Sequence, residues 1–405
     1  MTPPEVREPA LDALQDDELE ALLRSLPKSD IHCHLDGSMR PETVAELARD
    51  AEVEALAREY GFTLPPPRAS AKEMKELLCP GRECQSLVDY LKAFAYTVAV
   101  LQTPAALERA AYELAADCAA ENVRYLEVRF APMLHINRLM DGIDVLRAVD
   151  RGLDRAEREH AGKLKTAIIV CALRNFDRSL SAYYRGFAAA HRYANDNELA
   201  PLVSTESARL TVAAYEAGLK RVLAFDLAGP EENYPPKHHR DAFHTIISNL
   251  LNITVHAGEA YGPRSIVQAV AHLGAHRIGH GTRVLEEGSR LAEFLVDRRI
   301  PVEVCLTSNV QTRAVPSLAA HPFKRLLDAE VRTCICTDNR LVSDTTCTRE
   351  LFLAVRTFKL SAEEVRRVLL YGFKSAFLPY HDRRKILIDA KAELRERGLG
   401  WGQYH

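Results

Sequence analysis

The sequence predicts an α/β fold, a (β/α)8 TIM-type barrel, from three observations. Apolar, strand-like runs alternate with amphipathic helical stretches along the chain, a pattern typical of a parallel sheet covered by helices. Eight such runs occur, which is the number of strands in this barrel. Several of them end in histidine, glutamate or aspartate, and barrels of this class gather their chemistry at the C-terminal ends of the strands.

The expected strands are short and rich in apolar or β-branched residues. They cover residues 30–35, 123–130, 166–172, 222–227, 253–256, 277–280, 301–305 and 331–336. The segments between them carry apolar residues at helical spacing, as in residues 104–121, where Ala106, Ala110 and Leu114 recur.

One connection is longer than a barrel needs. Residues 40–103 separate the first two strands and contain a helical run at residues 86–100. We interpret this insertion as a lid over the mouth of the barrel, with Tyr90, Leu91 and Phe94 as its apolar contacts. The alternative interpretation is that these side chains only pack the lid helix.

The end of the chain is predicted to be helical. Residues 361–364 form a capping-box sequence, Ser-Ala-Glu-Glu, which marks the start of a helix. Residues 361–405 therefore add helices after the eighth strand, and residues 1–405 form one barrel domain that includes the lid. Residues 192–206 look like an insertion between the third and fourth strands, and no role is assigned to them.

The composition favours a globular enzyme with a small partner. The chain has 405 residues, 47% of them hydrophobic, and a net charge of −3. Such a charge provides no basic field for nucleic acid or an anionic membrane. No apolar run reaches the roughly 20 residues of a membrane helix, the start of the chain does not resemble a signal peptide, and nine cysteines lack a disulfide-like spacing. We therefore expect a cytoplasmic protein, while its oligomeric state does not follow from the sequence.

The ends of strands one, five and eight predict a metal site. His32 and His34 are two apart on a strand, so their side chains point to the same side. Together with His256 and Asp338 they form a catalytic set for one zinc ion per chain, with a position left for water. Zinc lowers the pKa of that water to roughly 7, which supplies a nucleophile at neutral pH.

Two further polar residues follow strands five and six. Glu259 and His280 are placed to act as acid and base beside the metal. Because the chain has 15 histidines, a single one carries little weight, and the argument depends on the set. His238, His239 and His244 lie in a Pro- and charge-rich loop and the helix after it, so we predict that they are surface residues.

These motifs resemble the adenosine deaminase family of the amidohydrolase superfamily, over residues 31–379. The matching segments are residues 32–38, 125–132, 225–229, 255–259, 279–281 and 337–338. The resemblance implies a zinc barrel that hydrolyses the 6-amino group of a purine nucleoside. Adenosine and 2′-deoxyadenosine would then give inosine and deoxyinosine plus ammonia.

The resemblance also implies a role for each site residue. The metal ligands would be His32, His34, His256 and Asp338. Glu259 would donate a proton to purine N1, His280 would lie beside the attacking hydroxide, and Asp338 would help to hold the developing tetrahedral centre. His34 would also face the substrate, together with two residues that contact it directly. Asp36 would meet the ribose 5′-hydroxyl, and the Gly229 N–H would meet purine N3.

Two positions bear on the choice of substrate. A carboxylate at Asp36 accepts from a 5′-hydroxyl and repels a 5′-phosphate, which favours a nucleoside over a nucleotide. Asn339 stands where the family has a second aspartate, thought to meet purine N7. An asparagine amide donates to N7 without an added proton, so binding is preserved in principle but the choice of purine nucleoside stays open.

Several alternatives remain at this stage. The substrate could be another 6-aminopurine, such as aminodeoxyfutalosine or adenine. A binuclear phosphotriesterase-like barrel would need a lysine at the end of strand four, where this chain has Asp226. From another class, the chain could be a nucleoside-binding protein that has lost catalysis, but binding alone requires neither Glu259 nor His280.

Overall fold

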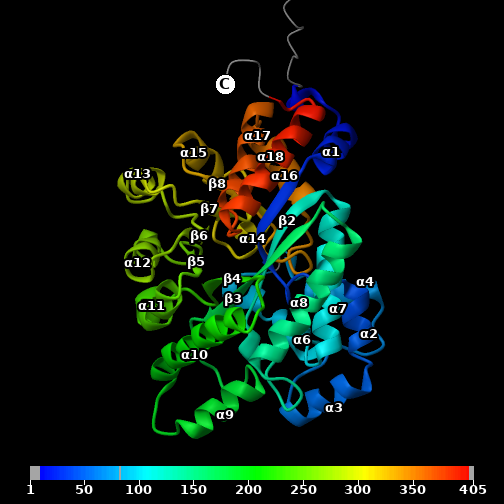
Figure 1. Cartoon of the computed structure of the whole chain (residues 1–405), viewed down its shortest axis with the longest axis vertical. Helices are drawn as coiled ribbons and strands as arrows, with labels where there is room; N and C mark the ends of the chain where they lie inside the picture. The colour runs from blue at the N-terminus through cyan, green and yellow to red at the C-terminus, as the bar shows by residue number, and fades with distance from the viewer. Residues whose placement is uncertain (1–9, 82–83, 401–405) are drawn as a thin grey trace, which may run out of the picture.

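Eight parallel strands form a barrel surrounded by helices in this computed structural model, which describes residues 10–81 and 84–400 (Figure 1). The strands pair in chain order and are β1 (Lys28–His34), β2 (Val123–Phe130), β3 (Lys165–Leu173), β4 (Val222–Ala228), β5 (Asn252–Ala257), β6 (Arg277–His280), β7 (Val302–Val304) and β8 (Thr333–Ile335). Two backbone bonds close the barrel. The His34 N–H donates to the Asp338 carbonyl at 2.7 Å, and the Asp338 N–H donates to the His32 carbonyl at 2.8 Å. The predicted (β/α)8 barrel is confirmed.

Helices connect the strands and cover the outside of the barrel (Figure 1). They are α7 (Pro104–Ala120), α8 (Gly142–Glu159), α9 (Ala182–Ala190), α10 (Asp196–Glu216), α11 (Arg240–Ser248), α12 (Pro263–Leu273), α13 (Arg290–Asp297), α14 (Leu306–Gln311), α15 (Phe323–Asp328), α16 (Cys347–Phe358), α17 (Ala362–Ser375) and α18 (Tyr380–Glu396), with α1 (Asp16–Ser25) before the first strand. Helix α17 begins at the predicted capping box, since Ser361 and Glu364 bond each other's backbone N–H groups.

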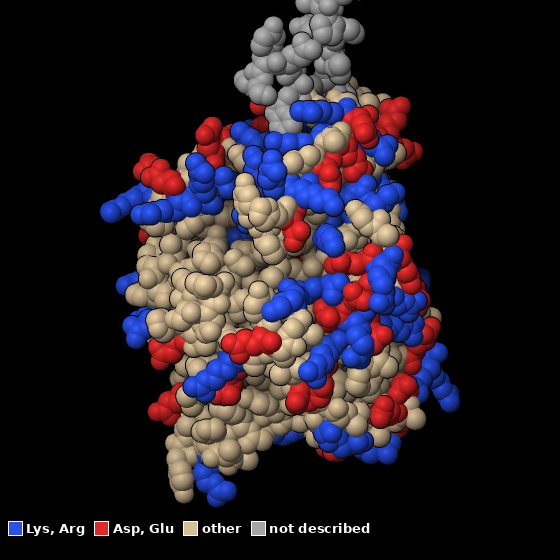
Figure 2. Space-filling model, viewed as in Figure 1, with Lys and Arg blue, Asp and Glu red and all other residues tan. Residues whose placement is uncertain are grey.

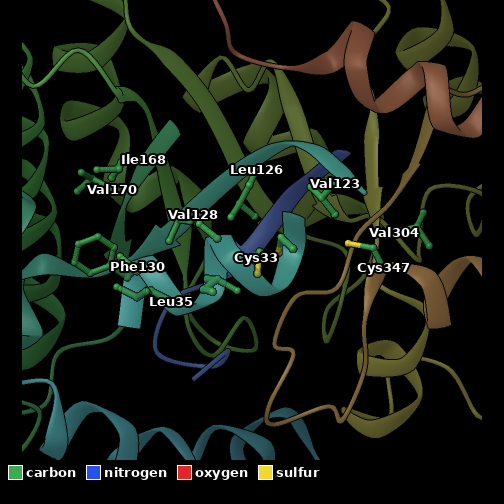
Figure 3. Close-up of a cluster of buried hydrophobic side chains, with 14 of the residues drawn as sticks. Cys33, Leu35, Val123, Leu126, Val128, Phe130, Ile168, Val170, Val304 and Cys347 are labelled. Carbon is green, nitrogen blue, oxygen red and sulfur yellow. The ribbon is translucent and has the colours of Figure 1, made fainter. Parts of the chain in front are cut away.

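Strand β2 illustrates how the sequence builds both sides of the barrel wall. Leu126, Val128 and Phe130 pack outward in the main hydrophobic cluster, as Figure 3 shows. Glu127 and Arg129 alternate with them and meet charged residues of other strands inside the barrel. The period of two along a strand explains this division. The barrel interior below the site is therefore charged.

In the described part of the insertion after β1, residues 40–81 and 84–103, helices are the regular elements. This part contains α2 (Pro41–Leu47), α3 (Ala51–Tyr60), α4 (Ala71–Leu78), α5 (Leu87–Leu91) and α6 (Phe94–Val100). The helical run predicted for residues 86–100 is present as two helices, α5 and α6, separated by residues 92–93. Backbone N–H groups of Lys92, Ala95 and Tyr96 bond carbonyls three residues back, and this tighter turn separates the two helices.

The segment at residues 192–206 forms a turn and the first half of α10. Asn195 and Glu198 make a capping box that starts this helix. Leu199 and Val203 then pack in a second hydrophobic cluster with Tyr184 of α9. The segment therefore supports the helices that follow β3.

One of the three histidines predicted to lie on the surface is buried. His239 ends the short 3-10 helix at residues 236–239, which packs on α10, and its Nδ1 lies 2.7 Å from the Ser204 hydroxyl. The charged loop sequence gives no sign of this contact, because its partner Ser204 lies on α10, which is distant in the sequence. His238 and His244 are exposed as predicted.

The surface carries both signs of charge. On the face in Figure 2, lysine and arginine are interspersed with aspartate and glutamate, as expected from the net charge of −3. None of the helices in residues 10–81 and 84–400 is long and apolar enough to span a membrane.

Candidate active site

Four strands bring polar side chains to one end of the barrel. His32 and His34 come from β1, His256 from β5, His280 from the end of β6, and Asp338 follows β8. The pairing register of β1 with β2 shifts around His32, an irregularity of the kind that re-aims side chains near active sites. His280 and Asp338 have φ of 63° and 62°. Left-handed backbone at non-glycine residues is strained and concentrates at functional sites.

The predicted metal ligands lie at distances that suit a shared cation. His34 Nε2 is 3.2 Å from His256 Nε2, and Asp338 Oδ1 is 3.4 Å from both His32 Nε2 and His34 Nε2. A tetrahedral site with bonds of about 2.0–2.1 Å separates its ligand atoms by about 3.3–3.4 Å. These three distances are compatible with a shared metal ion.

A fifth side chain belongs to the same cluster. Ligand atoms of His32, His256, His280 and Asp338 all lie within 4.8 Å of one another. Burial lowers the pKa of His34, His256 and His280, so these imidazoles are neutral, as metal ligation requires. This cluster contains three of the four predicted ligands together with His280, and His34 adjoins it through its contacts with His256 and Asp338.

Two carboxylates that we did not assign to the site orient the ligands. The Nδ1 of His32 lies 2.7 Å from Glu303 Oε2, and the Nδ1 of His256 lies 3.1 Å from Asp226 Oδ1. A carboxylate acceptor at Nδ1 leaves Nε2 free for a metal and fixes the ring. The sequence signal for Glu303 was a charged residue inside the apolar run at residues 301–305.

Two buried arginines balance these carboxylates. Arg129 donates to Asp226 and to Glu303 at 2.9 Å each, and Arg277 donates to Glu303 at 2.5 Å and to Glu127. Despite burial, Arg129 and Arg277 hold the pKa of Glu303 well below the usual range, and His256 and Arg129 do the same for Asp226. Buried charges need such pairing to stay ionised. The base of the site is therefore an ionic layer, made of these buried arginines and carboxylates.

Glu259 is buried beside the cluster. Its Oε2 lies 3.6 Å from His280 Nε2, and its Oε1 is buried without a hydrogen-bond partner among the described residues. Burial, together with the nearby carboxylates of Asp338 and Glu231, raises the pKa of Glu259 to about 8. This shift favours the protonated form of Glu259, the form that a general acid needs.

The loop that carries Glu259 is fastened by Glu231. This buried carboxylate accepts hydrogen bonds from four consecutive backbone N–H groups, of Gly258, Glu259, Ala260 and Tyr261, at 2.7 to 2.9 Å. Such oriented N–H groups favour an anion at their centre. Glu231 thereby sets the position of the Glu259 backbone, and sequence reasoning did not find it.

A cavity of about 400 Å³ opens onto the cluster. Its wall includes the lid residues Tyr90, Leu91 and Phe94 together with Leu134 and Leu173. The predicted lid contacts thus face the cavity. Its polar lining includes the predicted site residues His34, Asp36, Gly229, His256, Glu259, His280, Asp338 and Asn339.

Two lining residues besides Glu259 also carry a polar atom without a partner. Asp36 Oδ1 and Asn339 Oδ1 are buried and make no hydrogen bond within the described residues. Burial raises the pKa of Asp36 to about 7. Asn339 is pressed against Gly37, where a Cβ would lie 1.9 Å from its Oδ1. Unpaired buried atoms around one cavity are what a polar ligand would satisfy.

The barrel and its His/Asp cluster define a hydrolase with a candidate metal centre. Comparison with known proteins identifies the family. The adenosine deaminase family model matches residues 27–392. The chain therefore belongs to the adenosine deaminase family and is an aminohydrolase.

Relatives span nearly the whole chain. The adenosine deaminases of Mycobacterium ulcerans (strain Agy99) and Mycolicibacterium gilvum (strain PYR-GCK) are 38% and 39% identical to it, each over 90% of this chain and 94% of the relative. Among solved structures, the N6-methyl-AMP deaminase of Arabidopsis thaliana has a TM-score of 0.71 at 26% identity, over 93% of this chain and 99% of that one. The adenine deaminase of Arthrobacter aurescens, at 22% identity, shares the fold with a TM-score of 0.73, over 91% of this chain and 99% of that one.

Proposed function

We propose that this protein is a zinc-dependent deaminase of adenosine and 2′-deoxyadenosine, a single-domain cytoplasmic enzyme with one zinc per chain. The observation that carries the proposal is the position of Glu259. A buried carboxyl with an unpartnered Oε1 lies in the same cavity as the His/Asp cluster. Hydrolysis at C6 of a 6-aminopurine requires a proton donor and a metal centre in this combination.

The metal would be held by His32, His34, His256 and Asp338. When bound, zinc supplies Lewis-acid chemistry that lowers the pKa of water to roughly 7. The ionic layer below the site keeps the donor set fixed, because Glu303 and Asp226 hold the Nδ1 atoms of His32 and His256.

The reaction would use the proton on Glu259. Water oxygen adds to purine C6, the π electrons of the C6=N1 bond move onto N1, and N1 takes the proton of Glu259. One proton of the added water moves to the 6-amino group, ammonia leaves as the C6–N6 bond breaks, and the remaining hydroxyl proton returns to the Glu259 carboxylate to leave the 6-oxo product. The elevated pKa of Glu259 keeps its proton available near pH 7.

The remaining cavity residues would recognise the nucleoside. Asp36 would accept from the 5′-hydroxyl, the Gly229 N–H would donate to N3, and the Asn339 amide would donate to N7. A substrate hydroxyl would satisfy the unpaired Asp36 Oδ1, whereas a phosphate would bring a second negative charge to a buried carboxyl. This argument favours a nucleoside over the nucleotide that the Arabidopsis relative is named for.

A substrate panel tests the proposal. Purified zinc-loaded protein would be given adenosine, 2′-deoxyadenosine, adenine, AMP, N6-methyl-AMP and aminodeoxyfutalosine, and formation of the 6-oxopurine product would be measured. We expect the two adenosine nucleosides to give the highest kcat/KM. A higher value with AMP, adenine or aminodeoxyfutalosine would refute adenosine as the substrate, and no turnover of any compound would refute the enzymatic proposal.

A further inference from the structure

We propose that Asn309 and His321 are positioning residues that hold the His280 ring in one tautomer, with its proton on Nε2. This inference rests on the function proposed for the site. Asn309 belongs to α14, which follows β7, and His321 precedes α15. Both side chains are buried, and neither was identified from the sequence.

The backbone N–H of Phe323, which can only donate, determines the tautomer of His321. The backbone N–H of Phe323 donates to His321 Nδ1 at 3.0 Å. Because a backbone amide nitrogen does not accept hydrogen bonds, His321 Nδ1 carries no proton. Burial lowers the pKa of His321 to about 3, so the ring is neutral. Its single ring proton therefore sits on Nε2.

That proton fixes the amide of Asn309. His321 Nε2 lies 3.1 Å from Asn309 Oδ1 and donates to it. The Asn309 NH2 group then faces His280, whose Nδ1 is 2.9 Å from Asn309 Nδ2. A reversed amide would set two donors against each other at His321, and the Phe323 N–H prevents His321 from changing tautomer. The hydrogen bonds therefore run in one direction only.

His280 must then accept at Nδ1 and carry its proton on Nε2. Nε2 faces Glu259 Oε2 at 3.6 Å, and the residue lines the cavity. A ring held in this way presents an N–H to the reaction centre and has no lone pair there to receive a proton. The sequence left open whether His280 acts as an acid or as a base. This chain of hydrogen bonds makes His280 a donor at Nε2.

The tautomer can be read from the wild-type enzyme. Zinc-loaded protein labelled with ¹⁵N-histidine would be examined by long-range ¹H–¹⁵N NMR, which distinguishes protonated from unprotonated ring nitrogens. The spectrum of His280→Gln identifies the signals of His280. We expect the Nε2-protonated pattern, and an Nδ1-protonated or doubly protonated ring would overturn the proposal.

Variants test whether this tautomer matters for turnover. Asn309→Asp places an acceptor opposite both rings, so His280 should shift its proton to Nδ1 and kcat on adenosine should fall by roughly 100-fold. KM and zinc content should stay unchanged. His321→Gln keeps a donor toward Asn309 and should retain the wild-type tautomer, whereas His321→Phe should lose it. The matched control is Asn249→Asp, at the exposed position that follows α11.

The results separate this inference from the proposed function. A wild-type kcat in Asn309→Asp overturns the positioning role, and so does a wild-type kcat and spectrum in His321→Phe. Protein with the Nε2 tautomer that deaminates no purine nucleoside supports the tautomer assignment and overturns the proposed function. An active enzyme with the other tautomer overturns only the present inference.

Discussion

Glu259→Gln removes the proposed proton donor with almost no change in shape. Burial raises the pKa of Glu259 to about 8 in the metal-free protein, which favours the protonated side chain. A positioned general acid contributes roughly 10²- to 10⁴-fold. We therefore expect kcat to fall by that factor, which corresponds to about 3 to 5 kcal/mol in the barrier.

The pH dependence gives the sign of the effect. Glu259 is active when protonated, so wild-type kcat/KM should decline as pH rises through about 8. A cation at the His/Asp cluster moves this decline to lower pH. The decline should be absent in Glu259→Gln.

Stability provides a second readout in metal-free protein. The folded-state pKa of Glu259 is raised above its usual value of 4.5, so the folded state binds the proton more tightly than the unfolded state. The stabilising contribution is complete below about pH 4.5 and is lost as pH rises to about 8. The unfolding midpoint of Glu259→Gln should therefore rise relative to wild type across this window.

The assay is ammonia release from adenosine, with zinc content measured on each sample. Glu287→Gln, at an exposed position in the loop after β6, is the matched control and should behave as wild type. Turnover of Glu259→Gln within a few-fold of wild type, at equal zinc content, would refute the assignment of the donor.

Three other changes have defined outcomes. Asp36→Ala should lower kcat/KM for adenosine by about 10- to 100-fold, because a hydrogen bond to a charged group is lost. The loss should be much smaller for 5′-deoxyadenosine, which lacks the 5′-hydroxyl. Equal losses on the two substrates would show that Asp36 has only a structural role. If Asn339 donates to N7, 7-deazaadenosine should lose about 1–3 kcal/mol of transition-state stabilisation relative to adenosine, and equal efficiency with the two substrates would argue against this contact. Asn339→Asp should make adenosine turnover more pH-dependent, because the new carboxyl must be protonated to donate to N7. Asp226→Asn should weaken zinc binding about 10- to 100-fold in chelator competition, and an unchanged affinity would show that His256 needs no such support.

Much of the fold followed from local patterns. The predicted strands at residues 123–130 and 277–280 match β2 and β6, because apolar runs ended by polar residues are local signals. The helical run at residues 86–100 is confirmed apart from the two-residue turn between α5 and α6, which nothing in its residue types marks. Tertiary context decided that boundary.

The candidate site was predictable only where the strand ends themselves carry the polar group. His32, His34 and His256 stand in such positions, and the structure brings them together. Glu303 was missed although a lone glutamate in an apolar strand signals a buried charge pair. Asn309 and His321 could not be found this way, because their roles depend on contacts of the segment before α15 with α14 and of α14 with His280, which is distant in the sequence.

The most direct measurement is a zinc titration of chelator-treated protein, with ammonia release from adenosine followed at each addition. We expect no activity without metal and a linear rise that stops at one zinc per chain. Activity in the metal-free protein, or a rise that continues to two ions per chain, would contradict a single zinc held by His32, His34, His256 and Asp338.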